Sequence, residues 1–334
     1  MTSTGRLIGV DLARCLALVS MFVAHTAPSA GPAGVLNLSE FLTAPLFALL
    51  IGTAAFYSAE RMSFPVLFAS SVVRAIALVA VGLYIEGWGA QVDIVLPYLG
   101  VLSLLMAPLV YLPSWALGAL AAASWWFAAV LKNYFSDAYY AASAQGGYLH
   151  YLYQWVFTGT NYQAFTLLCY ACAGAVVAAG VQRWGAAGDA ALAVATTGLA
   201  GVVFWYTRGL PYEFMPYTAS RLEIGFSLLI SLAALGWSCL AARLLAAKMR
   251  LLAPFVAAGK MTLSLYVLQV AVLAAYVAYA PRFGLPTSDD SWVMMGGLMV
   301  GSLVFAWLWD RLLGATFARR GPLETPLAWI SGRG

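Results

Sequence analysis

The most constraining feature of this chain is a series of long apolar stretches that recur along almost its whole length. Residues 12–24, 72–85 and 222–240 are examples, and polar or proline-containing breaks separate them. Of the 334 residues, 63% are hydrophobic and 9% are charged, whereas soluble domains are roughly half apolar and about one quarter charged. Because a water-soluble fold of this length could not bury so much apolar surface, the sequence predicts an all-α, polytopic integral membrane protein.

Ten stretches are long enough to cross a bilayer, which takes about 20 residues. The expected spans lie near residues 7–27, 39–58, 65–86, 92–112, 114–131, 163–182, 189–207, 221–242, 256–279 and 292–312. Prolines mark several of the breaks, for example Pro113 between the fourth and fifth spans. No linker rich in glycine, serine or charge divides the chain, so we expect residues 1–334 to form a single transmembrane domain.

The basic residues indicate how the ten spans are oriented. One set of helix ends carries most of them: Arg6, Arg61, Arg74, Arg183, Arg243, Lys248, Arg250, Lys260, Arg311, Arg319, Arg320 and Arg333. The opposite ends carry Lys132, Arg208, Arg221 and Arg282. Because cytoplasmic loops are enriched in lysine and arginine, we expect both termini to be cytoplasmic. The expected location is the cell membrane, and in a bacterium the cytoplasmic membrane.

The longest predicted connection, residues 132–162, then lies outside and is rich in aromatic residues. These are Tyr134, Phe135, Tyr139, Tyr140, Tyr148, Tyr151, Tyr153, Trp155 and Tyr162. One interpretation is an interfacial helix or re-entrant segment with an aromatic belt. The other is a lid or stacking platform for a sugar-like acceptor.

The sharpest local signal is a polar stripe on the first predicted span. Arg14 and His25 are eleven residues apart, close to three helical turns, so they share one helix face about 16 Å apart. Asp11 lies within a turn of Arg14 on nearly the same stripe. Ionisable residues inside a span indicate a functional site, although Asp11 and Arg14 alone are also typical of a structural ion pair.

The layout of the stripe suits a long donor molecule whose charged head stays cytoplasmic while its reactive end reaches outward. Arg14 can bind phosphate through its planar, permanently charged fork. His25 can take a proton from an attacking hydroxyl or amine, or can accept an acyl group itself.

The sequence resembles a known group of membrane enzymes at several places. Arg14, ten intervening residues and His25 resemble the Arg-x10-His signature of the family-3 membrane acyltransferases. The context RLIGVDLARCLAL at residues 6–18 is more similar to the YeiB-like and heparan-α-glucosaminide N-acetyltransferase-like proteins of the same superfamily. Further stretches resemble YeiB-like motifs in the same order: DIVLPYLG at 93–100, GTNY at 159–162, GKMTLSLYVLQ at 259–269 and GPLE at 321–324.

This resemblance implies a membrane acyltransferase with an acyl-CoA donor, most simply acetyl-CoA, and an extracytoplasmic glycan or glycolipid acceptor. Arg14 is then expected to bind the donor with Asp11 as its orienting partner, and His25 is expected to be catalytic. A carboxylate could orient His25, and Glu40 is the first choice because it lies at the outer start of the next span. The other polar residues predicted near that face are Glu86, Asp93, His150, Glu213 and Glu223.

Two other function classes remain open from the sequence. One is a proton-coupled transporter in which the stripe lines a conduction path, and the other is a non-catalytic membrane scaffold. The chain has no nucleotide-binding loop or metal-binding spacing, and a net charge of +4 is too small to indicate a nucleic-acid partner. Small residues at 174–180 permit close helix contact, which leaves a homodimer open.

Overall fold

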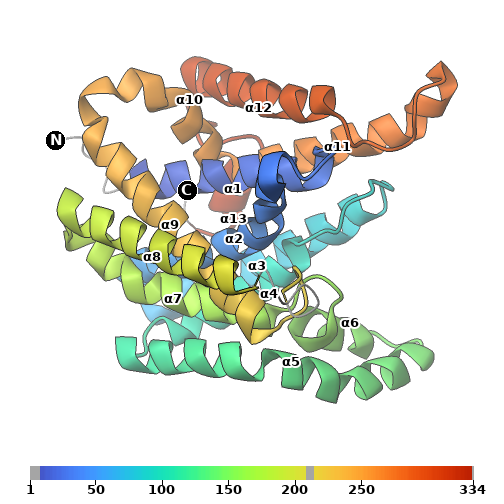
Figure 1. Ribbon diagram of the computed structural model, residues 1–334, viewed down its shortest axis with the longest axis horizontal. Coiled ribbons are helices and arrows are strands. Elements are labelled where there is room, and N and C mark those ends of the chain that lie inside the picture. Colours follow the sequence, from blue (N-terminus) through green and yellow to red (C-terminus); the bar gives the residue numbers. More distant parts are fainter. Residues whose placement is uncertain (1–7, 208–213, 333–334) are drawn as a thin grey trace.

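The computed structural model describes residues 8–207 and 214–332, and every regular element within these ranges is a helix (Figure 1). Arg6, Arg208, Glu213 and Arg333, which the sequence analysis used, lie outside the described residues. The α-helices are α1 (Ile8–Thr26), α2 (Leu38–Ala59), α3 (Phe64–Glu86), α4 (Leu96–Leu109), α5 (Ser114–Ala144), α6 (Leu149–Tyr153), α7 (Ala164–Arg183), α8 (Ala186–Thr207), α9 (Arg221–Leu244), α10 (Met249–Lys260), α11 (Thr262–Tyr279), α12 (Trp292–Leu313) and α13 (Glu324–Ile330).

Within the described ranges, nine helical segments are long and apolar enough to cross a membrane. This confirms the predicted all-α, polytopic membrane fold. The fourth expected span, near residues 92–112, corresponds to α4, which has 14 residues and begins at Leu96 rather than near residue 92. Residues 92–95 are not helical, and Val92, Asp93 and Val95 among them line the two cavities described below.

Two further elements differ from the expected boundaries. The stretch expected as one span over residues 256–279 is divided at Met261, whose φ of −115° and ψ of 34° interrupt the helix between α10 and α11. Helix α5 has 31 residues and continues well beyond residue 131. No proline or glycine stops it before Gly146, which adopts a positive φ of 70°.

The aromatic segment 132–162 is therefore helical over much of its length and packs largely on itself. The ring of Phe135 on α5 stacks on Phe157 with centroids 4.3 Å apart and lies 5.9 Å from Tyr153. Of the aromatic residues named above in this segment, Tyr162 lines a cavity. These contacts favour the structural interpretation for most of the segment.

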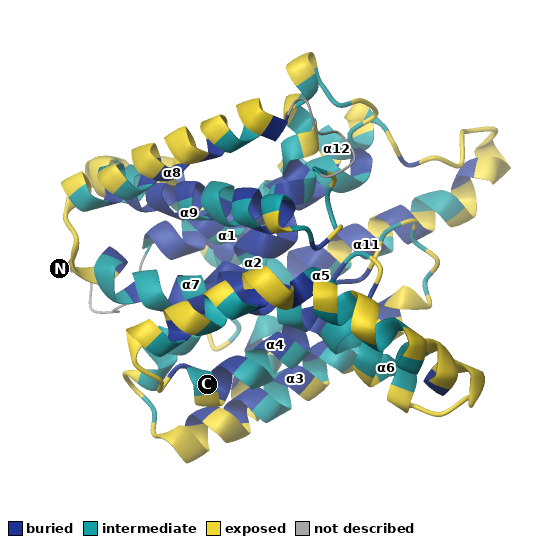
Figure 2. Ribbon diagram, turned by 60° about the horizontal axis from the view of Figure 1, so that its bottom comes forward, coloured by how far each residue is buried: buried dark blue, intermediate teal, exposed yellow. Residues whose placement is uncertain are grey.

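Helices α1 and α2 form the centre of the molecule, with α7, α9 and α10 packed around them. Figure 2 shows buried residues concentrated on these central helices and exposed residues on the outer faces of α8 and α5. Many exposed residues of the outer helices are large and apolar, for example Val202 and Trp205 on α8. An apolar exterior of this kind is what a lipid environment requires.

Helices α2 and α7 approach each other through two glycines. A Cβ atom at Gly52 would lie 1.8 Å from the carbonyl oxygen of Ala171, and one at Gly174 would lie 2.0 Å from that of Leu49. Thr53 Oγ1 donates to the carbonyl oxygen of Gly174 at 3.3 Å across the same interface. Backbone-to-backbone packing through small residues is typical of helices in membranes.

The two ends of α1 define two sides of the molecule. We name the side where α1 begins the Arg14 side, and the side where it ends the His25 side. The N-terminal part of α3 and the C-terminal end of α10 lie on the Arg14 side, because Arg74 and Lys260 line a cavity there together with Arg14. The start of α2 lies on the His25 side, where Glu40 and His25 line a second cavity.

Candidate active site

The predicted stripe on α1 reaches both cavities. Arg14 Nη1 donates a hydrogen bond to Asp11 Oδ1 at 2.8 Å. Asp11 is almost fully buried, whereas a quarter of the Arg14 side chain is exposed. Both residues line the cavity on the Arg14 side, and His25 lines the cavity on the His25 side. This ion pair lies at the wall of the first cavity.

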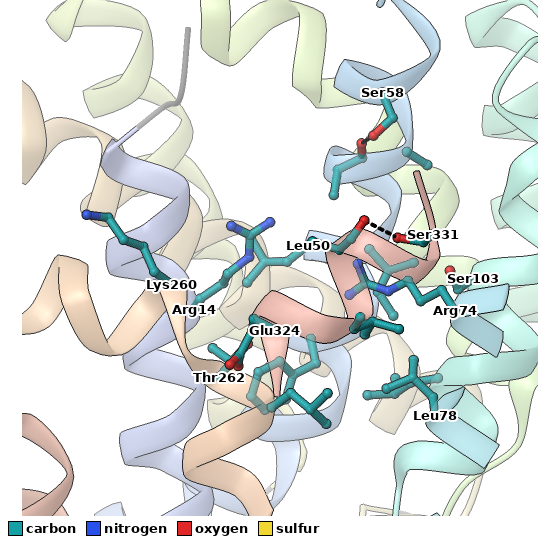
Figure 3. Close-up of a pocket in the computed structure, with 18 of the residues that line it drawn as sticks. Arg14, Leu50, Ser58, Arg74, Leu78, Ser103, Lys260, Thr262, Glu324 and Ser331 are labelled. Atoms are coloured by element: carbon teal, nitrogen blue, oxygen red, sulfur yellow. Dashed lines mark hydrogen bonds between the residues drawn. The ribbon is translucent and has the colours of Figure 1, made fainter. Parts of the chain in front are cut away.

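The Arg14-side cavity has a volume of about 460 Å³ and a strongly basic lining (Figure 3). The basic residues that line it are Arg14, Arg61, Arg74, Lys260 and Arg320. Figure 3 shows Arg14 and Arg74 approaching the cavity on either side of α13. Arginine forks and lysine ammonium groups are the usual partners of phosphate, so this cavity fits a ligand with several phosphate groups. From the sequence alone, Arg61, Arg74, Lys260 and Arg320 indicate only the topology.

The deeper wall of the Arg14-side cavity is apolar and leads toward the second cavity. Leu78, Leu99 and Leu263 contribute to it, together with Val95 and Tyr266. The Tyr266 hydroxyl accepts a hydrogen bond from the backbone N–H of Val95 at 3.2 Å. Val95 is two residues beyond Asp93, which lines the second cavity, so the contact between Tyr266 and Val95 lies in the wall between the two cavities.

The C-terminal segment closes part of the Arg14-side cavity. Helix α13 begins at Glu324, whose carboxylate accepts hydrogen bonds from the backbone N–H of Ser264 at 2.9 Å and from its hydroxyl at 2.5 Å. Burial raises the pKa of Glu324, while the hydrogen bonds from Ser264 oppose the rise. These contacts hold α13 against the start of α11. Leu327, Ala328 and Ser331 thereby become part of the cavity wall.

The His25-side cavity has a volume of about 300 Å³ and brings together residues from distant parts of the chain. Its polar lining consists of His25, Glu40, Gln91, Asp93, Asn161, Tyr162, Tyr217, Asp289 and Asp290. His25 and the expected partner Glu40 thus share one cavity. Of the other polar residues considered, Asp93 also lines it, whereas Glu86, His150 and Glu223 line neither cavity.

The side-chain partner of His25 is Gln269 on α11. The Gln269 amide lies 2.9 Å from His25 Nδ1, and Gln269 is almost fully buried. When the amide oxygen faces the ring, Nδ1 carries the proton and Nε2 can accept one; when the amide nitrogen faces the ring, the roles reverse. Gln269 therefore controls which nitrogen of His25 is basic. Gln269 is the last residue of the motif at 259–269, but the sequence alone predicts no role for it.

Glu40 is held by a different residue. Its carboxylate accepts a hydrogen bond from the hydroxyl of Tyr217, which lies in the loop before α9. Burial raises the pKa of Tyr217 above its ordinary value, so Tyr217 keeps its proton and acts as a donor. Tyr217 also has a positive φ of 66°, a conformation that is uncommon for a residue with a side chain. The sequence carried no signal for this pairing, because the two residues are far apart in the chain.

The comparison with known families decides the class of the protein. The model of acyltransferase family 3, an acyltransferase domain, matches residues 7–311. The chain belongs to this family. It is therefore a membrane acyltransferase. In this family-3 member the matched region includes Asp11, Arg14, His25 and Gln269. Helix α13 lies beyond the matched region. No curated protein and no solved structure gives a match to the chain.

Proposed function

We propose that this family-3 acyltransferase transfers an acetyl or other short acyl group from acyl-CoA, bound on the Arg14 side, to a glycan or glycolipid on the His25 side. The observation that carries the proposal is the position of the two cavities. A single helix, α1, contributes Arg14 to a basic cavity at one end and His25 to a second cavity at the other. Because most basic helix ends are on the Arg14 side, that side is assigned to the cytoplasm.

In the proposed reaction Arg14 and the other basic residues bind the phosphates of the donor, and its thioester end reaches His25 past Tyr266. Helix α11 supports this path, since Thr262 and Tyr266 line the first cavity and Gln269 contacts His25. His25 takes the proton of an acceptor hydroxyl or amine as that group attacks the thioester carbonyl carbon. The carbon–sulfur bond breaks, and the thiolate of CoA leaves. In a variant of this scheme His25 carries the acyl group transiently.

Acetyl-CoA binding to the detergent-purified protein tests the donor site directly. We expect Arg14→Ala to weaken binding about tenfold or more, equivalent to about 1.4 kcal/mol, because a charge-assisted contact with phosphate is lost. Arg74→Ala is also expected to weaken acetyl-CoA binding, while the ion pair of Asp11 and Arg14 stays in place. Isothermal titration calorimetry measures both.

Arg250→Ala is the matched control for these variants. Arg250 is exposed on α10 and lies outside the lining of the Arg14-side cavity. Its replacement therefore removes one positive charge, as in the other two variants, without removing a contact with acetyl-CoA. Equal affinity in Arg14→Ala, Arg74→Ala and Arg250→Ala would contradict the donor site. If the folded wild-type protein binds no acetyl-CoA at millimolar concentration, the proposed acyl-CoA donor is wrong.

Gln269→Leu is expected to lower kcat about 10²-fold with little change in the KM for acyl-CoA. The reason is that Gln269 contacts the imidazole and not the basic cavity, so its loss disturbs the proton acceptor while leaving donor binding intact. Steady-state kinetics separate the two parameters. Leu268→Ala, at the exposed neighbouring position on α11, serves as the control. A Gln269→Leu enzyme that changed KM alone would show that the residue only shapes a binding surface.

A further inference from the structure

The His25-side cavity has a distinctly acidic lining. Four carboxylate side chains contribute to it: Glu40 from α2, Asp93 from the segment before α4, and Asp289 and Asp290 from the loop before α12. Within the described part of the chain, no lysine or arginine lines this cavity. The nearby Lys132 directs its ammonium group to the backbone oxygens of Thr160 and Tyr217, at 3.2 and 3.5 Å. The charge of the lining is thus opposite to that of the Arg14-side cavity.

One of these carboxylates is buried and incompletely bonded. Asp289 is only 5% exposed, and its Oδ2 atom has no hydrogen-bond partner among the described residues. In contrast, Glu40 accepts from Tyr217, Asp93 from Asn161, and Asp290 from Ser288. A buried carboxylate oxygen without a partner costs free energy, which a ligand that donates hydrogen bonds would recover.

The loop that carries Asp289 and Asp290 is held beside His25. The backbone N–H of Ser291 donates to the carbonyl oxygen of Thr26 at 2.9 Å, and Thr26 directly follows His25. The two aspartates are therefore attached to the end of the helix that carries the catalytic candidate. No three His, Cys, Asp or Glu side chains of the described residues are grouped as a metal site would require, so the geometry does not fit a metal ion and favours an organic cation.

We propose that the acceptor carries a protonated amine, which Asp289 and Asp290 bind, and that the atom acylated is a neighbouring hydroxyl. This inference rests on the proposed function and specifies its acceptor. An acceptor bearing phosphate or carboxylate near the reacting end is disfavoured by the same four carboxylates.

The site of acylation follows from the charge of the cavity. Nearby carboxylates stabilise the protonated form of a bound amine, and a protonated amine has no lone pair with which to attack a thioester. The hydroxyl oxygen therefore forms the new bond to the acyl carbon, and its proton passes to His25. The carbon–sulfur bond breaks with its electron pair on sulfur, and the products are an ester and the thiolate of CoA.

Three simple probes of different charge test the inference: methyl glucoside, which is neutral, its 2-amino analogue, which is cationic, and its uronic acid analogue, which is anionic. With acetyl-CoA as donor at pH 6.5, the amino probe is expected to have a kcat/KM about tenfold or more above that of the neutral probe, and the acidic probe the lowest. In Asp289→Asn and Asp290→Asn the ratio of kcat/KM for the amino probe to kcat/KM for the neutral probe is expected to fall to within about threefold. Asp137→Asn, an exposed acid on α5 that lies outside the cavity lining, is the control.

Two further readouts make every outcome decisive. The product from the amino probe is expected to be an ester, which hydroxylamine cleaves, and an amide product would overturn the assignment of the hydroxyl. Thermal stabilisation by each probe reports binding without turnover. Transfer without charge preference overturns this inference alone, whereas charge-selective binding without any transfer overturns the proposed function instead. Failure of the amino probe to stabilise the wild-type protein overturns the inference, as does acyl transfer to the neutral probe but not to the amino probe.

Discussion

Replacement of His25 with alanine is expected to lower acyl transfer by about 10²- to 10⁴-fold, the usual contribution of a positioned general base. A larger loss is expected if His25 also carries the acyl group. Acetyl-CoA affinity is expected to stay at the wild-type level, because His25 lines the His25-side cavity and not the basic one. The measurement is CoA release with an acceptor present, together with calorimetry of acetyl-CoA binding on the same preparation.

His150→Ala is the matched control, since the chain has two histidines and His150 lies outside both cavities. Its Nδ1 is 2.6 Å from the carbonyl oxygen of Gly147 at the connection between α5 and α6. It is expected to leave transfer and donor binding unchanged. Turnover in His25→Ala close to that of His150→Ala would remove His25 from the mechanism while leaving the donor site intact.

Gly174→Ala is expected to destabilise the protein by about 3 kcal/mol, at the upper end of ordinary overpacking. The added methyl group would lie 2.0 Å from the carbonyl oxygen of Leu49, and a backbone oxygen cannot move aside as a flexible side chain can. Helices α2 and α7 would have to separate, and the start of α2 carries Glu40 into the His25-side cavity. Thermal unfolding in detergent is expected to show a Tm lower by about 6–12 °C.

Gly198→Ala provides the comparison for this substitution. Gly198 lies on the exposed face of α8, and a Cβ there would meet no atom within 4 Å. Because alanine favours helix more than glycine does, this variant is expected to be neutral or slightly more stable. Equal Tm values for the two variants would show that the contact between α2 and α7 adjusts without cost.

Hydropathy and charge predicted most of the architecture, because a membrane span must be apolar along its length whatever its neighbours are. The same argument failed where helical structure does not depend on apolar content. Helix α5 extends past Lys132 through polar residues, aromatic residues and alanines, all of which are compatible with a helix. The break at Met261 has no proline; it lies two residues beyond Gly259, where a Cβ would be 1.9 Å from the carbonyl oxygen of Asp11. Only the packed structure reveals that contact.

The candidate site was predictable to the extent that it lies on one helix. The spacing of Asp11, Arg14 and His25 on α1 is a local property, and the structure reproduces the pair of Asp11 and Arg14. The partner of His25 is 244 residues away in the chain, and helical spacing gives no information at that separation. Glu40 was expected beside His25; it does line the same cavity, but its hydrogen bond goes to Tyr217.

The wall between the two cavities has a consequence for the cell that contains such an enzyme. In the proposed cycle the nucleotide end of the donor stays among the arginines, and only the acyl group passes the contact between Tyr266 and Val95. Moving the charged phosphates of CoA through the hydrocarbon region would cost much free energy, whereas a short acyl group carries no charge. In that proposed cycle the acyl group would leave the Arg14 side while the CoA would stay there.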